Sequence, residues 1–262
     1  METVKANRGY PTPHPEVNEI IEQVLKNAEA ILQSNFLGMY LHGSLATGDF
    51  DSKSSDIDFV VVTKDGISDV SIEALKESYA HIFSIGKKWA RALEGTYIPQ
   101  KEFRRYQPSD GPYVCVHEEN FYLAHHESHW VIQRHVLRKQ GAVMAGPDPI
   151  TLIDSVSPED LKQAVKSFLR EWWAPILQES ERLEKRDYQV YAVLTMCRAL
   201  FSLETGEVAS KPVSARWVQI AHPKWKDLIE WALDHERAAL PDRISESKAF
   251  ITYTLNQSQV NF

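Results

Sequence analysis

The chain has 262 residues, of which 43% are hydrophobic and 25% charged, a composition that excludes a disordered or fibrous protein. Its 36 acidic residues outnumber its 29 basic residues, and the formal net charge of −7 argues against non-specific nucleic-acid binding. The first 15 residues do not resemble a targeting segment, and no run reaches the ~18 apolar residues of a membrane span. Two cysteines, Cys115 and Cys197, predict no disulfide framework. We therefore expect a cytoplasmic protein that has no membrane or nucleic-acid partner.

Helical periodicity alternates with short apolar runs in the first part of the chain. In chain order, these patterns predict a helix, two strands, a helix and a weaker strand at 17–32, 36–41, 56–63, 71–82 and 92–98. The second helix is expected to start with Ser71 as its cap, and residues 42–55 are rich in turn formers. Residues 100–119 have no clear periodicity. This order predicts an α+β domain over 1–150, with a mixed sheet flanked by helices.

Strand patterns nearly vanish beyond Asn120, and helical patterns replace them. A proline at 158, directly after Ser157, is typical of a capped helix start. Later helices are predicted at 187–205, 214–221, 224–239 and 245–256. The change of pattern predicts a second domain, an α-helical bundle over 151–262. No flexible linker separates the two parts, so we expect them to pack directly on one another.

Residues that bear chemistry lie beside two of the predicted strands. Gly43 and Ser44 follow the first strand, and Asp56 and Asp58 stand at the start of the second. Residues two apart on a strand share a face, and two neighbouring carboxylates are costly unless a cation such as Mg²⁺ neutralises them. Gly43 allows a phosphate to approach the backbone, and Ser44 adds a hydroxyl and an amide donor. Either pair alone is usually an ordinary turn or strand end, but the two in this context predict a phosphate and metal site.

Two further polar groups have alternative interpretations. Glu94 completes an acidic triad if its strand lies beside the strand of Asp58, and otherwise it faces solvent. His125 and His129 are four residues apart, with Glu127 between them, and could hold a transition metal from one helix face. No distant ligand is evident for that metal, so we favour a solvated or interdomain helix over a zinc site.

The motifs resemble those of a known enzyme family. Gly43-Ser44 followed by Ser55-Asp56-Ile57-Asp58 resembles the signature of the polymerase-β-like nucleotidyltransferase superfamily. The stretch Val193–Leu200, with the Ser-Lys-Pro and Ala-Arg-Trp segments that follow it, resembles the helical domain of the streptomycin/spectinomycin (aminoglycoside) adenylyltransferases. The resemblance extends from about Gly38 to about Leu255. It implies an N-terminal nucleotidyltransferase fold and a C-terminal helical bundle.

The resemblance also implies an activity and residue roles. The enzyme would move AMP from ATP to a hydroxyl of an aminoglycoside or aminocyclitol antibiotic and release pyrophosphate. Asp56, Asp58 and Glu94 would hold Mg²⁺, and Glu94 would also be the general base. Arg198 and Lys211 would contact the triphosphate of ATP from the helical domain. Without the resemblance, Arg198 could be a surface arginine that shields apolar neighbours, and Lys211 an ordinary loop lysine.

The acceptor is less well determined than the reaction. Relatives hold a cationic drug with acidic and amide side chains just before the Leu-Thr-x-x-Arg segment, where this chain has Asp187, Tyr188 and Tyr191. We expect these three residues to contact the acceptor, which would be of the streptomycin or spectinomycin type. Two other functions stay open: transfer to a hydroxyl of a protein or another small molecule, and an inert nucleotide-binding regulator.

Overall fold

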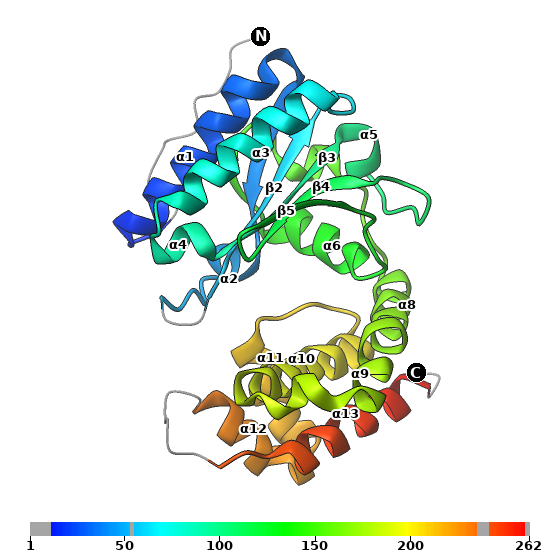
Figure 1. The fold of residues 1–262 in the computed structure, drawn as a ribbon. Helices are drawn as coiled ribbons and strands as arrows, with labels where there is room; N and C mark the ends of the chain where they lie inside the picture. Colours follow the sequence, from blue (N-terminus) through cyan, green and yellow to red (C-terminus); the bar gives the residue numbers. More distant parts are fainter. Residues whose placement is uncertain (1–11, 53–54, 235–240, 260–262) are drawn as a thin grey trace. The chain divides into compact units, whose positions relative to one another are not determined.

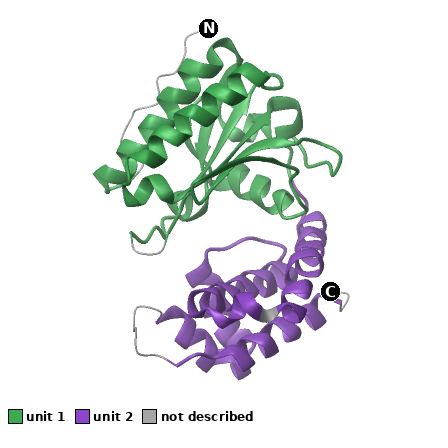
Figure 2. Cartoon of the chain, viewed as in Figure 1, with its two compact units in different colours: residues 1–155 green, residues 156–262 purple. Residues whose placement is uncertain are grey.

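The chain forms two compact units, residues 1–155 and 156–262, in a computed structural model that describes residues 12–52, 55–234 and 241–259 (Figure 2). The first unit contains a sheet with helices, and the second consists of helices. The predicted α+β class, with a mixed sheet followed by a helical region, is confirmed. No helix among the described residues is both long and apolar enough to cross a membrane.

The first unit is built on a six-stranded sheet with the order β5-β4-β3-β2-β1-β6. Its strands are β1 (Phe36–Leu41), β2 (Ile57–Thr63), β3 (Leu93–Pro99), β4 (Tyr113–His117), β5 (Asn120–Ala124) and β6 (Ala142–Ala145). Strands β2 and β3 are parallel, and the other neighbouring pairs are antiparallel. The sheet is therefore mixed, and β5 and β6 are its edges.

Helices cover both faces of this sheet (Figure 1). The longer ones are α1 (Pro15–Leu32) and α3 (Asp69–Ser84) on one face and α6 (Trp130–Gln140) on the other; the shorter ones are η1 (Gln33–Asn35), α2 (Gly43–Thr47), α4 (Lys88–Arg91), α5 (Gln100–Phe103) and α7 (Pro149–Leu152). Alternate residues of β2 pack into two hydrophobic cores, one on each face of the sheet. Phe59 and Val61 pack with α1 and α3, whereas Val60 and Val62 pack with Leu137 of α6. The same alternation places Asp58 on the α6 face.

Some local expectations were wrong. Ser68, not Ser71, caps α3: its Oγ accepts a hydrogen bond from the backbone N–H of Ser71 at 3.3 Å, so the helix begins at Asp69. Strand β4 lies within the unassigned stretch, and β5 and β6 lie beyond Asn120, where strand patterns were expected to vanish. β6 has four residues, too few to show an alternation, and it pairs with β1 about a hundred positions earlier. These strands depend on long-range pairing that local patterns do not reveal.

The second unit is a helical bundle around α10. Its elements are α8 (Pro158–Phe168), η2 (Leu169–Trp173), α9 (Ala174–Gln178), η3 (Ser180–Glu184), α10 (Arg186–Thr205), α11 (Lys211–Ala221), η4 (Pro223–Trp225), α12 (Lys226–Leu233) and α13 (Ile244–Gln259). The Ser157 cap is confirmed, because its Oγ accepts from the backbone N–H of Asp160 at 3.1 Å. Helix α10 packs against α8, α11, α12 and α13 and forms the centre of the bundle. The end of the helix predicted at 224–239 lies outside the described residues.

Candidate active site

The two halves of the Gly-Ser and Asp-x-Asp motif touch each other. Gly43 begins α2 directly after β1 with a positive φ of 59°. A Cβ atom on Gly43 would lie 2.0 Å from Oδ2 of Asp58, and the backbone N–H of His42 donates to the carbonyl of Asp58 at 3.1 Å. Only glycine combines this backbone conformation with so close an approach of a carboxylate. The glycine thus leaves the space that the Asp58 carboxylate occupies.

We expect Gly43→Ala to impair the AMP transfer that the resemblance implies far more than it impairs folding. The left-handed backbone costs alanine about 1 kcal/mol, whereas displacing the Asp58 carboxylate from the expected metal site should cost roughly 10²-fold in kcat/KM, the usual effect of misplacing a group at a reaction site. Gly48→Ala is the matched control. Gly48 also has a positive φ, 79°, but a Cβ there meets nothing within 4 Å. Thermal unfolding and steady-state rates of both variants test this expectation, and equal rates for the two would contradict it.

The loop between the motif halves is anchored at both ends. Ser55 donates its backbone N–H to the carbonyl of Asp51 at 2.9 Å, and its Oγ accepts from the backbone N–H of Asp51 at 2.9 Å. Lys88 of α4 donates to the carbonyl of Ser52 at 2.5 Å, and the rings of Phe50 and Trp89 lie 5.3 Å apart. The serine of the predicted signature therefore closes the loop that leads into Asp56.

Sheet register brings the acidic residues together. Asp58 on β2 is the direct neighbour of Glu94 on β3, and the two strands are parallel. Neighbouring strands lie about 4.8 Å apart, and paired residues share a face. Asp58 is half-buried, whereas Glu94 and Asp56 are exposed. The strand of Glu94 thus lies beside the strand of Asp58, which is the condition for Glu94 to join the two aspartates.

Two histidines that sequence reasoning did not select extend this line of residues. His117 on β4 is the register partner of Glu94, and His42 lies beside Asp58 through its backbone hydrogen bond. His42, Asp58, Glu94 and His117 therefore lie in one row across four neighbouring strand ends. Burial lowers the pKa of His42 to about 4, so this imidazole is neutral at pH 7 and adds no charge beside Asp58. His42 directly precedes the Gly-Ser motif in the sequence, whereas only strand pairing identifies His117.

The acidic residues do not form a preassembled metal cage. Within the described part of the chain, no group of three or more His, Cys, Asp and Glu side chains is arranged to hold a metal ion. The carboxylates of Asp58 and Glu94 are neighbours by register, and Asp56 flanks β2 on its N-terminal side. The arrangement offers hard oxygen donors without a complete set of protein ligands, which suits a cation that keeps part of its coordination for substrate oxygens.

The predicted residues of the second unit lie on α10 and α11. Arg198 is a half-buried residue of α10, and Lys211 is the first residue of α11. The Oγ of Ser210 accepts from the backbone N–H of Val213 at 3.5 Å and caps α11. Lys211 is therefore presented at a helix start and not in an irregular loop, which was the alternative.

Aromatic side chains surround the predicted acceptor residues on α10. The ring centroids of Tyr188 and Tyr191 are 5.6 Å apart, and both lie within 6.0 Å of the buried Trp173 ring. The ammonium of Lys211 lies 5.6 Å from the ring centroid of Tyr191, close enough for a cation–π contact. Asp187 is exposed in the first turn of the same helix. The structure thus brings Tyr188, Tyr191 and Lys211 together.

The expected helix at His125 and His129 was wrong. Both residues precede α6, which begins at Trp130, so their spacing does not place them on one helix face. The Nδ1 of His125 lies 2.9 Å from the carbonyl of Asp110, whereas the ring of His126 stacks on Trp130 at 3.7 Å. Burial, with the Arg134 charge second, lowers the pKa of His126 to about 2. Within this segment only His126 is buried, and its ring packs between the sheet and Trp130 at the start of α6.

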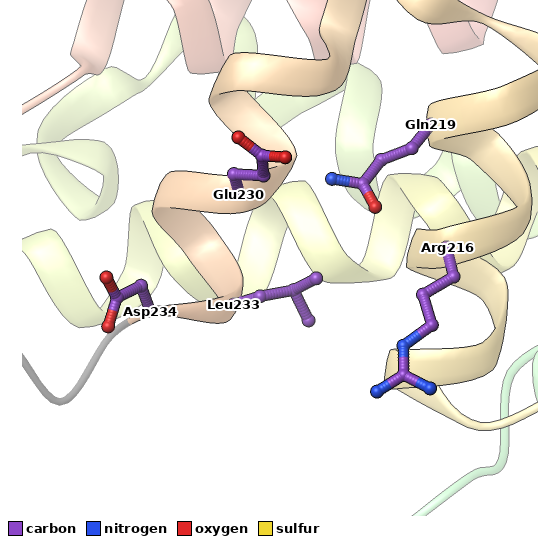
Figure 3. A pocket seen from close by; sticks show the side chains of 5 residues that line it. All are labelled: Arg216, Gln219, Glu230, Leu233 and Asp234. Atoms are coloured by element: carbon purple, nitrogen blue, oxygen red, sulfur yellow. The ribbon is translucent and has the colours of Figure 1, made fainter.

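A shallow pocket of about 430 Å³ lies in the second unit, away from the predicted site residues (Figure 3). Arg216 and Gln219 of α11 and Glu230, Leu233 and Asp234 at the end of α12 line it. Its charges are mixed, and although Arg216 belongs to the Ala-Arg-Trp segment, none of the predicted site residues lines the pocket. The pocket therefore adds nothing to the site.

Comparisons with known proteins agree with the motifs. Residues 21–110 match the nucleotidyltransferase domain, and residues 151–258 match the C-terminal domain of aminoglycoside adenylyltransferases. A spectinomycin 9-adenylyltransferase from Campylobacter jejuni is 29% identical over 78% of this chain and 79% of its own length. The enzyme of the same name from Staphylococcus aureus is 27% identical over 91% of this chain and 94% of its own length.

A solved structure shows the same fold. The spectinomycin adenyltransferase from Enterococcus faecalis, crystallised with ATP and spectinomycin, superposes with a TM-score of 0.71 at 22% sequence identity. The match covers 92% of this chain and 99% of that protein. Taken together, the two domain matches in their expected order, the relatives and the shared fold show that the chain belongs to the aminoglycoside adenylyltransferase family of enzymes, within the nucleotidyltransferase superfamily.

Proposed function

We propose that the protein transfers AMP from ATP to a hydroxyl of an aminocyclitol antibiotic and releases pyrophosphate, with Mg²⁺ as its metal. The observation that carries the proposal is the register of Asp58 beside Glu94, with Gly43 packed against the Asp58 carboxylate. Phosphate-binding backbone, carboxylates for a cation and a carboxylate base are the parts that nucleotidyl transfer to an alcohol requires. These three parts come from the adjacent ends of β1, β2 and β3 in one sheet.

The residues present fit Mg²⁺. This ion takes one or two carboxylates and keeps its remaining positions for water and substrate phosphates, so a complete protein cage is not needed. Asp56 and Asp58 would hold it, with Glu94 at its edge. When bound, the ion supplies positive charge to the α-phosphate and to the departing pyrophosphate.

Protein groups would perform the remaining tasks. The backbone and hydroxyl of Ser44 would bind phosphate oxygens, and Gly43 would let them approach. Glu94 would take the proton from the acceptor hydroxyl as its oxygen attacks the α-phosphorus. The bond from that phosphorus to the bridging oxygen breaks on the opposite side, and pyrophosphate leaves with the bonding electrons. The product is an AMP ester of the antibiotic.

The second unit would supply charge and acceptor contacts. Arg198 and Lys211 would neutralise the triphosphate, because a guanidinium or an ammonium binds phosphate oxygens strongly. Asp187 would attract an ammonium group of the acceptor, and Tyr188 and Tyr191 would pack against its rings. We propose spectinomycin as the first acceptor to test, because the named relatives act on it. A reaction that uses ATP, in a chain with both cysteines free, supports a cytoplasmic location.

Mass spectrometry tests the proposal directly. Purified protein with ATP and Mg²⁺ is incubated with spectinomycin, streptomycin and other aminoglycosides, and each reaction is examined for an AMP adduct and for pyrophosphate. We expect an adduct on spectinomycin that disappears when EDTA removes the metal. Binding of Mg-ATP without transfer to any acceptor would refute the proposal and favour a nucleotide-binding regulator. An adduct on the protein itself would favour transfer to a protein hydroxyl.

A further inference from the structure

On the α6 face of the sheet, side chains become more exposed to solvent toward the strand ends that carry Glu94 and His117. On β4, Tyr113 is 3% exposed and Cys115 is 9% exposed, and His117 at the strand end is only half-buried. On β3, Thr96 is 2% exposed, whereas Glu94 is exposed. The rings of His126 and Trp130 close the buried end of this face. The side chains that cover this face therefore bury the pair Thr96 and Cys115 but leave the next pair on the face, Glu94 and His117, at least partly exposed.

Tyr122 stands at the border between the covered and the open parts. It lies on the edge strand β5 and is the register partner of Cys115, so its side chain is on the same face as Glu94 and His117. It stays 44% exposed. Burial, then the charges of Cys115 and Glu94, raise the pKa of the Tyr122 hydroxyl. The function described so far gives this exposed aromatic side chain no role.

We propose that Tyr122 is an acceptor-binding residue whose ring packs against the saturated ring that presents its hydroxyl to Glu94. The inference rests on the proposed function and assigns one side of the acceptor site to β5. A cyclic polyol has C–H faces that pack on an aromatic ring and hydroxyls that bond with a phenol, and tyrosine offers both. Ligand sites typically combine such aromatic surfaces with a few polar groups. The edge position of β5 leaves the ring accessible from the side of the sheet.

Kinetics of variants at β5 test the assignment. Tyr122→Ala removes the ring, and Tyr122→Phe keeps the ring but removes the hydroxyl. Leu123→Ala is the matched control, because Leu123 is the next residue of β5, is 53% exposed and faces the opposite side of the sheet. Each protein is assayed for kcat and for the KM of spectinomycin and of ATP, and its thermal unfolding is recorded. We expect Tyr122→Ala to raise the KM of the acceptor roughly tenfold, the effect of losing one aromatic contact.

The pattern across the variants separates binding from folding. The KM of ATP should change less than about twofold, Tyr122→Phe should retain most of the acceptor affinity, and Leu123→Ala should behave as wild type. An unchanged acceptor KM in a folded Tyr122→Ala protein would overturn the assignment while wild-type transfer upholds the proposed function. An equal rise in both KM values, or the same change in Leu123→Ala, would also overturn it. If the wild-type protein transfers AMP to no acceptor, both the function and the assignment fail.

Discussion

Glu94→Gln should reduce kcat for AMP transfer by roughly 10²–10⁴-fold, the usual contribution of a general base. Glutamine keeps the size and hydrogen-bonding reach of the side chain but cannot accept the proton from the acceptor hydroxyl. Glu94 is an exposed residue of β3 and glutamine has nearly the same shape, so the fold should remain intact. Binding of Mg-ATP, measured by calorimetry, should weaken by less than about threefold.

A nearby glutamate provides the control for Glu94→Gln. Glu119 lies in the turn between β4 and β5, is exposed and pairs with Arg91 at 3.3 Å. Glu119→Gln removes the same charge near the same sheet edge, and the loss of one exposed ion pair should cost little. Its kcat should stay within about twofold of wild type. If Glu94→Gln turns over at the wild-type rate, Glu94 is not the base.

Asp58→Asn should reduce kcat/KM by about 10³-fold, because it removes a negative charge from the proposed metal site, and bound metals contribute several kcal/mol to such reactions. Asparagine has the same shape, so the contact with Gly43 should survive. The concentration of Mg²⁺ needed for half-maximal activity should rise sharply. Excess Mg²⁺ should recover part of the rate in Asp58→Asn but not in Glu94→Gln, which separates the metal role from the base role.

The same substitution should stabilise the protein in the absence of metal. Asp58 and Glu94 are like charges on paired residues of adjacent strands, an arrangement that costs about 0.2–1 kcal/mol. Removing one charge should therefore raise the free energy of unfolding while activity falls. Asp49→Asn, at an exposed position in the loop between α2 and β2, is the control and should change neither the free energy of unfolding nor the activity. A loss of stability in metal-free Asp58→Asn would contradict the inferred repulsion.

Local sequence patterns predicted the parts of this protein that depend on neighbours in the chain. The strand of Phe59 to Val62 follows from a run of β-branched residues, and the Ser157 cap from the proline after it. The same reasoning failed where two local solutions compete: Ser68 and Ser71 are both good caps, and the position of the first turn of α3 decided between them. It also failed at His125 and His129, because spacing alone does not show whether a segment is helical.

The sequence by itself therefore determined the fold class and the family, and it singled out Gly43, Ser44, Asp56 and Asp58 as candidate site residues, since each of these depends on residues close together in the chain. Only the tertiary structure decided which strands are neighbours. The parallel register of β2 and β3 made Asp58 and Glu94 a pair across 36 positions, and the pairing of β3, β4 and β5 added His117 and Tyr122. Strand order and register result from long-range packing on both faces of the sheet. A local sequence pattern therefore does not indicate which strands pair with each other.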